Sequence, residues 1–210
     1  MEKRESIIPE QRVGNQLDTF NSITASSEEE ARQVFLMAVN RLLDVNVWNK
    51  ISGKLSSTFR LTDEKGNEIG GPAKPGNHFK IDIPGPGPAS GEGNDWVKVE
   101  ALEDERDPSG KKESVTLRVR PTADPENNEK DTAHFFDEAA TSSFRVEREG
   151  NTVTASVHGR NEQPNTDVEN TSDKMRNALV GTGAVAGFSA PQWKALVNGL
   201  LDTSIRTDTD

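Results

Sequence analysis

Few side chains in this sequence are of the types that carry out catalysis or bind metals. There is no Cys and no Tyr, and the three histidines are His78, His134 and His158. The lack of cysteine excludes disulfides, thiolate metal sites and cysteine nucleophiles. The histidines do not have the spacing of a helical zinc motif, and there is no G-x-S-x-G nucleophile elbow. We therefore predict no catalytic residue, no metal and no cofactor. The sequence favours a protein that is not an enzyme.

The histidines are expected at the surface. His78 stands at the start of a predicted strand, His134 in a loop, and His158 on the solvent face of another strand. The acidic side chains of segments 103–105 and 131–138 are expected to be solvated. A calcium site there is an alternative, although no EF-hand spacing supports it.

A tract rich in Gly and Pro, within residues 79–100 (FKIDIPGPGPASGEGNDWVKVE), raises the question of a phosphate-binding loop. Such a loop needs converging backbone N–H groups and usually opens a helix. Here three prolines remove N–H groups, Glu92 and Asp95 would repel phosphate, and a strand follows. We predict that residues 85–94 form a solvent-exposed connection without nucleotide affinity. A mobile lid over a site is the alternative.

The composition favours one acidic domain with a lean core. The chain has 210 residues, a net charge of −10, a pI near 4.9 and 31% hydrophobic residues. A uniformly acidic chain repels phosphate backbones, so nucleic acid is not an expected partner. No signal-peptide segment or membrane span is visible. We predict a soluble, cytoplasmic protein with one domain over residues 1–210, a polar leader at 1–16 and a flexible tail at 202–210.

Six segments alternate apolar and polar residues, which predicts half-buried antiparallel strands. A weaker alternation precedes them at residues 17–26. The charged side chains fall on the predicted solvent face, where we interpret Arg118 and Arg120 as members of cross-strand ion pairs and not as an anion site. The apolar residues of the six segments are Phe59 and Leu61; Phe79, Ile81 and Ile83; Val97, Val99 and Ala101; Val115, Leu117 and Val119; Phe144 and Val146; and Val153, Ala155 and Val157.

A helix is predicted between the first, weak strand and these six. Ser27 and Glu30 have the spacing of a capping box, in which a hydroxyl and a carboxylate bind backbone amides at the helix start. An apolar stripe follows within residues 35–42, at the spacing of one helical face. A second, short helical piece is predicted at residues 47–51, and Gly53 ends it.

Two further helical segments are predicted near the C-terminus. The first begins at Ser172 and ends at Gly187, and its small residues make it thin. The second begins at Ser189 and carries a strong apolar stripe. Burying such side chains contributes roughly 1.5–3 kcal/mol each, so this helix must dock on the sheet. The stripe consists of Trp193, Leu196, Val197, Leu200 and Leu201.

The order of these elements predicts an α+β fold, because a sheet with one apolar face needs helices to cover it. The order resembles that of the START-like proteins, the SRPBCC superfamily of Bet v 1 and the polyketide cyclases. The resemblance covers about residues 17–201, and its local signature is NSITASSEEEARQVF followed by Trp48. It implies a helix-grip fold, in which a curved antiparallel sheet of about seven strands wraps a C-terminal helix. The interruption at residues 187–189 departs from the long final helix of that family.

The resemblance also implies a pocket for an apolar or amphipathic ligand, between the sheet and the last helices. We therefore predict a small-molecule binding or carrier protein. The same side chains packing against one another is the alternative reading of this interior. A polar side chain directed into the pocket would favour an enzyme acting on a small hydrophobic substrate, and a filled interior would favour a protein-interaction module. The predicted lining residues are Phe79, Ile81, Val97, Val99, Leu117, Val119, Phe144 and Val146 from the sheet, with Leu179 and Val197 from the helices.

Overall fold

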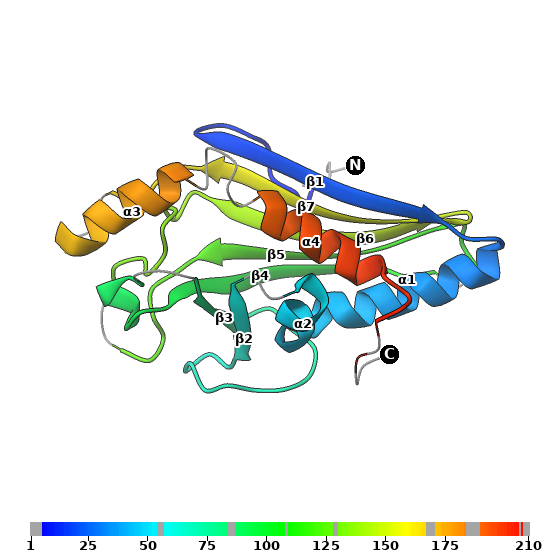
Figure 1. The fold of residues 1–210 in the computed structure, drawn as a ribbon, viewed down its shortest axis with the longest axis horizontal. Helices are drawn as coiled ribbons and strands as arrows, with labels where there is room; N and C mark the ends of the chain where they lie inside the picture. The colour runs from blue at the N-terminus through cyan, green and yellow to red at the C-terminus, as the bar shows by residue number, and fades with distance from the viewer. Residues whose placement is uncertain are drawn as a thin grey trace, which may run out of the picture.

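The computed structural model describes residues 6–53, 57–83, 87–107, 109–127, 130–166, 171–183, 190–205 and 207. A strand and two helices precede six strands, and two more helices follow (Figure 1). The elements are β1 (Asn15–Thr24), α1 (Glu28–Leu43), the 3-10 turn η1 (Val45–Val47), α2 (Trp48–Ser52), β2 (Thr58–Thr62), β3 (His78–Asp82), the 3-10 turn η2 (Ala89–Gly91), β4 (Asp95–Glu105), β5 (Lys112–Pro121), β6 (Thr141–Glu149), β7 (Thr152–Glu162), α3 (Thr171–Gly183) and α4 (Ala190–Leu201).

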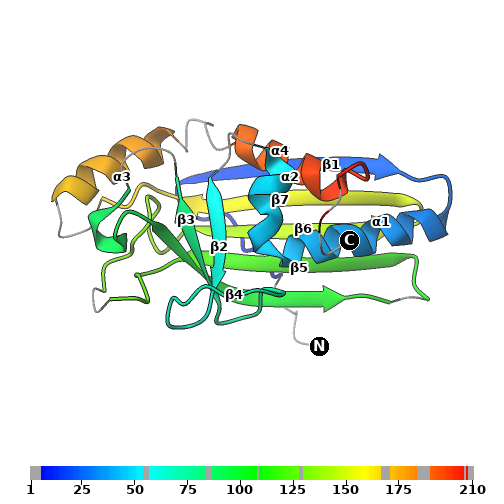
Figure 2. The ribbon, with the colours of Figure 1, turned by 60° about the horizontal axis from the view of Figure 1, so that its bottom comes forward.

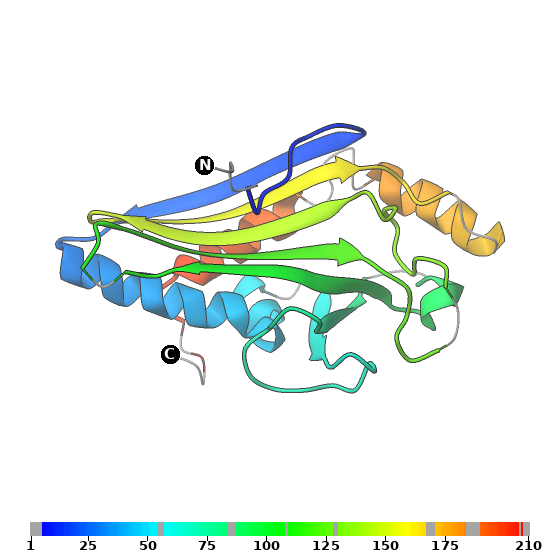
Figure 3. The same ribbon diagram turned by 180° about the vertical axis from the view of Figure 1, so that it is seen from behind.

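The seven described strands form one antiparallel sheet in the order β1-β7-β6-β5-β4-β3-β2. Helices α1, α2 and α4 lie on one face, which we call the inner face, and Figure 3 shows the opposite, outer face in front of the helices. The predicted α+β helix-grip fold is therefore confirmed, and α4 is the C-terminal helix that the sheet curves around.

The start of α1 shows how the sequence sets a helix boundary. The Ser27 hydroxyl accepts a hydrogen bond from the Glu30 backbone N–H at 3.2 Å, as the predicted capping box requires. The reciprocal bond differs, because the Glu30 carboxylate accepts from the backbone N–H of Ser26 at 2.8 Å and from the Ser26 hydroxyl. Two hydroxyl residues thus share the cap.

The strand alternation places the apolar side chains on the inner face with one exception. The ladder between β4 and β5 changes register between Val99 and Ala101. Ala101 is therefore opposite Arg118, which belongs to the outer face, and Leu102 takes the position opposite Leu117. The prediction that Ala101 shares a face with Val99 is wrong because a bulge adds one residue to a strand and reverses the faces beyond it.

The Gly/Pro tract is less exposed than predicted. Residues 84–86 lie outside the described part of the chain, but Ser90 and Gly91 in η2 are buried. The backbone N–H groups of Ala89 and Ser90 donate to the Asp173 carboxylate at 2.6 and 2.9 Å. The prediction that residues 85–94 form a solvent-exposed connection is therefore wrong at η2, because α3 packs against this turn through Asp173.

Helix α3 lies beyond the end of the sheet, beside η2, whereas α4 and α2 lie next to each other over the inner face (Figure 2). The interruption predicted near Gly187 falls between α3 and α4, among residues outside the described part. Cover for the inner face comes from α1, α2 and α4. The N-terminal helices therefore contribute to the cover, which the sequence assigned to the C-terminal helices.

Two of the three histidines are buried, contrary to the prediction that all three lie at the surface. His78 is 7% exposed, and burial lowers its pKa below the ordinary value. His134 is 6% exposed, and burial lowers its pKa to about 4. Its ring stacks on Phe135, with centroids 4.2 Å apart. His134 is therefore packed against other side chains although it lies in a loop.

Candidate functional site

The predicted lining residues come together in the core between the inner face and the helices. None of the nine with a described side chain is more than 7% exposed. The side chain of Leu179 lies outside the part of the chain that the structure describes. The nine are Phe79, Ile81, Val97, Val99, Leu117, Val119, Phe144, Val146 and Val197.

Trp48 occupies the centre of this interior. Its ring centroid lies 5.3 Å from that of Phe59, 5.7 Å from that of Phe79 and 4.7 Å from that of Phe144. Its indole N–H donates to the Arg41 carbonyl oxygen at 3.0 Å, which fixes the ring. The sequence singled out Trp48 as a mark of the family, but its position as the ring that joins three strands was not predicted.

Trp193 connects these rings with the surface. Its centroid lies 5.4 Å from that of Phe144 and 6.2 Å from that of Phe59, and Trp193 itself is only half-buried. We call the rings of Trp48, Phe59, Phe79, Phe144 and Trp193 the aromatic cluster. The cluster runs from the centre of the sheet to the first turns of α4.

The C-terminal end of α4 is anchored by a fully buried arginine. Arg41, from α1, donates to three backbone carbonyl oxygens, those of Gly199 at 3.1 Å, Asp202 at 2.8 Å and Ile205 at 2.5 Å. Carbonyl groups at a helix end lack intrahelical partners and carry partial negative charge, so a guanidinium satisfies them and complements the helix dipole.

Close packing adds to this anchor. A Cβ placed on Gly199 would lie 2.2 Å from the backbone oxygen of Ile51. Only a residue without a side chain lets α4 approach α2 so closely. The end of α4 is therefore fixed by both hydrogen bonds and backbone contact.

The N-terminal end of α4 is held more lightly. The Gln192 side-chain oxygen accepts from the Ser57 hydroxyl at 3.1 Å and from its N–H at 3.4 Å. The Lys194 ammonium donates to the backbone oxygen of Phe20, in the edge strand β1, at 2.8 Å. The Gln192 bonds are part-buried, as are two of the three Arg41 bonds, and the Lys194 bond is exposed. The two ends differ in that the Arg41 side chain and its bond to Gly199 are fully buried, which strengthens that bond.

A buried polar cluster lies at the end of the sheet near α3. Arg176 donates to both Asp95 carboxylate oxygens, at 2.9 and 2.5 Å, and the Phe135 backbone N–H donates to the same carboxylate at 3.0 Å. Asp95 is fully buried. The sequence identified Asp95 only as a residue that would repel phosphate, whereas it serves to dock α3.

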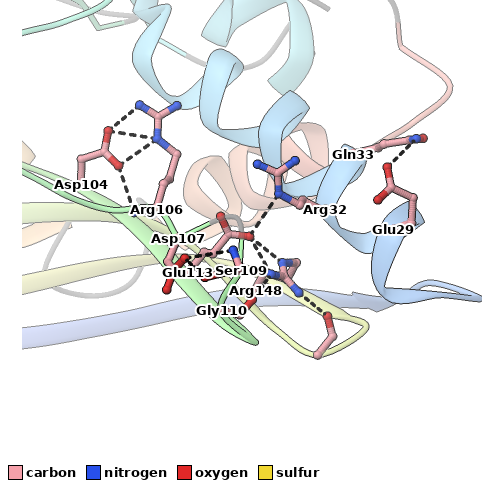
Figure 4. A network of polar contacts seen from close by, with 11 residues as sticks. Glu29, Arg32, Gln33, Asp104, Arg106, Asp107, Ser109, Gly110, Glu113 and Arg148 are labelled. Atoms are coloured by element: carbon pink, nitrogen blue, oxygen red, sulfur yellow. Dashed lines mark hydrogen bonds and ion pairs between the residues drawn. The ribbon is translucent and has the colours of Figure 1, made fainter.

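A second buried ion-pair network ties the far end of the sheet together (Figure 4). Glu113 in β5 is 1% exposed and accepts from Arg148 in β6 at 2.7 and 2.9 Å. Arg148 also donates to the Gly110 and Gly150 carbonyl oxygens. Arg32, from α1, approaches the same carboxylate at 3.8 Å. The Glu113 and Arg148 side chains are buried and Arg32 is 32% exposed, so we assign the network to stability.

Arg118 and Arg120 lie on the outer face and pair with Glu100, as predicted. Arg118 also donates to the backbone oxygen of Ile7 at 3.1 Å, and Arg120 to that of Glu138 at 2.6 Å. A groove of about 1110 Å³ is lined by Arg118 and Arg120, by residues 101–105 and by the segment near Ile7. The two arginines share the Glu100 carboxylate, and Glu103, Asp104 and Glu105 also line the groove, so its charge does not favour an anion.

Among the described residues, no group of three or more His, Asp and Glu side chains could hold a metal ion. Within the same residues, the helices are all too short or too polar to cross a bilayer.

No protein-family model and no curated protein matches the chain. Solved structures do. The crystal structure of Ara h 8.0201 matches with a TM-score of 0.35 and 12% identity, over 89% of this chain and 99% of that one. Ginseng major latex-like protein 151 from Panax ginseng matches with 0.33 and 17%, over 82% and 97%. Protein Ms6760 from Mycobacterium smegmatis matches with 0.36 and 13%, over 90% and 92%. These scores are low, and the helix-grip assignment rests on the observed sheet order and on the position of α4.

Proposed function

We propose that the protein binds an apolar or amphipathic small molecule against the aromatic cluster, beneath the first turns of α4. The observation that carries this proposal is the unequal attachment of α4. The fully buried Arg41 side chain ties its C-terminal end through three bonds, whereas Gln192 and Lys194 hold its first turn through part-buried and exposed bonds. Displacement of the first turn would uncover Trp193 and the rings beneath it, and would leave the Arg41 anchor in place.

The chemistry of the interior sets the class of ligand. The core cluster around the rings consists of hydrophobic side chains, which offer dispersion contacts and buried area. A ligand would gain about 25 cal/mol per Å² of apolar surface buried, before the costs of association and of moving Trp193. Lys194, at the surface end of the cluster, provides a positive charge for an acidic head group.

A protein-interaction module is the second candidate, because aromatic side chains fill the centre of the interior. Trp48 contacts three phenylalanine rings within 6 Å between centroids, so the space at the centre is occupied by the chain itself. A ligand must therefore displace side chains in order to bind. If these side chains are never displaced, the protein would instead act through its surface.

A fluorescence titration with cis-parinaric acid, a fluorescent fatty acid, tests the first candidate. We expect saturable binding with energy transfer from Trp48 and Trp193, measured in a Trp96→Phe background to remove the third tryptophan. Gln192→Ala should raise the association rate by on the order of 2- to 10-fold, since a net hydrogen bond contributes about 0.5–1.5 kcal/mol.

Gln33→Ala is the matched control, because Gln33 bonds only Glu29 among the contacts described on the exposed side of α1. It should leave the association rate unchanged. Absence of saturable binding, or equal rates in all three proteins, would remove the carrier proposal and leave the interaction module.

A further inference from the structure

Three side chains on the outer face form a continuous hydrogen-bonded relay. The Asp18 Oδ1 lies 2.6 Å from the His158 Nδ1. The other ring nitrogen, Nε2, lies 3.0 Å from the Ser156 Oγ. A carboxylate, an imidazole and a hydroxyl joined in this order through these atoms are the arrangement that activates a serine nucleophile.

The sheet itself positions the relay. Ser156 and His158 are two residues apart in β7, so their side chains share one face, and Asp18 in β1 is the register partner of His158. Figure 3 shows this face of β1 and β7. All three residues stand on paired strands, which hold them more rigidly than a loop would.

The Asp18 carboxylate determines which nitrogen of the His158 ring donates to it. Asp18 also accepts from Arg160 at 2.8 Å. Although partial burial raises it, the hydrogen bonds from Arg160 and His158 hold the pKa of Asp18 below its ordinary value. An ionised Asp18 can only accept, so the N–H in this hydrogen bond belongs to the His158 Nδ1. Nε2 is then free to accept the Ser156 hydroxyl proton.

The neighbours of Ser156 provide the other two requirements of acyl transfer. Arg145, opposite Ser156 in β6, pairs with Glu147 through Nη2 at 3.1 Å, while its Nε is buried and has no hydrogen-bond partner within the described residues. This donor can stabilise negative charge on an ester oxygen. Phe20, opposite Ser156 in β1, is 64% exposed and can contact an apolar acyl group. Ser156 is 7% exposed, so only a slender acyl group can reach its hydroxyl.

We propose that Ser156 is a nucleophile that transfers the acyl group of small esters with an apolar acyl chain to water. Its Oγ forms a bond to the ester carbonyl carbon while its proton passes to the His158 Nε2. The ester C–O bond then breaks, and the same proton passes from Nε2 to the leaving alcohol oxygen. Water attacks the acyl-serine, loses a proton to Nε2, and releases the carboxylic acid as the proton returns to Oγ.

A fluorophosphonate probe, which labels activated serines, tests this site in the full-length chain. We expect mass spectrometry to find the label on Ser156, and p-nitrophenyl butyrate to be hydrolysed. Ser156→Ala should abolish both. His158→Gln should lower both rates by about 100-fold or more, the usual contribution of a general base.

Ser22→Ala is the matched control, because the Ser22 hydroxyl lies on the same face in β1 and bonds Thr154 at 2.8 Å. It should keep both rates. Arg145→Met leaves the relay intact and should lower kcat with little change in KM. An unlabelled Ser156, or a labelling rate equal to that of the parent in a folded His158→Gln variant, would overturn the proposal. Binding of cis-parinaric acid should be the same in Ser156→Ala and the parent, which separates this site from the aromatic cluster.

Discussion

The guanidinium of Arg41 in α1 lies 3.1 Å from the backbone oxygen of Gly199 near the end of α4, and both residues are buried. The two helices, which both cover the inner face, are joined at this point. Helix α4 is therefore held by α1 as well as by the sheet.

Arg41→Met should destabilise the protein by about 2–5 kcal/mol, because it removes the guanidinium from one buried and two part-buried carbonyl groups. Urea unfolding followed by tryptophan fluorescence gives the free energy. Arg106→Met removes a more exposed ion pair with Asp104 and should lower the free energy of unfolding by less than about 1 kcal/mol, the usual range for a surface pair. Equal losses in the two variants would contradict the anchoring role.

Gly199→Ala should cost about 1–3 kcal/mol, because the added Cβ would lie 2.2 Å from the Ile51 oxygen and push α4 away from α2. Gly70→Ala is the control, since a Cβ there meets nothing within 4 Å. Thermal melting of the two variants measures the difference. A Gly199→Ala protein as stable as the control would show that α2 and α4 adjust without cost.

Arg148→Met should cost about 3–5 kcal/mol, because it leaves the buried Glu113 carboxylate without its main partner. The double variant Arg148→Met/Glu113→Leu should recover much of that loss, since neither charge is then buried. A double-mutant cycle by urea unfolding measures the coupling. Strict additivity of the two single losses would mean that the pair is not coupled.

Glu162 is expected to make stability fall with rising pH. Burial raises its pKa from 4.5 to about 7, although Arg160 opposes the shift. Because the folded protein binds this proton more tightly than the unfolded chain, the contribution is complete below about pH 4.5 and is lost as the pH rises through about 7.

We expect Glu162→Gln to remove this dependence. The parent should lose on the order of 2–3 kcal/mol relative to the variant between those two pH values. Urea unfolding across the range measures it, and Glu149→Gln, whose side chain is 76% exposed, is the control. A difference between parent and Glu162→Gln that does not change with pH would contradict the assignment.

Much of the fold was predictable because alternation and capping are local signals. The period-two runs located six strands, and the stripe from Trp193 to Leu201 located α4. The bulge after Val99 was not predictable, since one extra residue leaves the local pattern intact while it reverses the faces that follow.

The sites depended on register between distant segments, which no local pattern contains. Asp18 and His158 are 140 residues apart in the chain, and neither stood out as more than a surface side chain. Burial of His134 likewise depends on Phe135 and on loops that meet only in the folded protein. Where the signal was local, in the apolar residues, burial was predicted correctly except at Ala101, whereas the contact between Asp18 and His158 was not predicted.

The pairing of β1 with β7 has a consequence for how the chain folds. Thr24 pairs with Thr152 and Asn15 with Glu162, so the first strand has its only described ladder with the last. During synthesis β1 must wait, unpaired, until nearly the whole sheet has emerged from the ribosome. Contacts between such distant segments slow folding to milliseconds or longer. We expect stopped-flow refolding in that range, with β1 amides the last to gain protection in pulsed hydrogen exchange; early protection of β1 would show that it first pairs elsewhere.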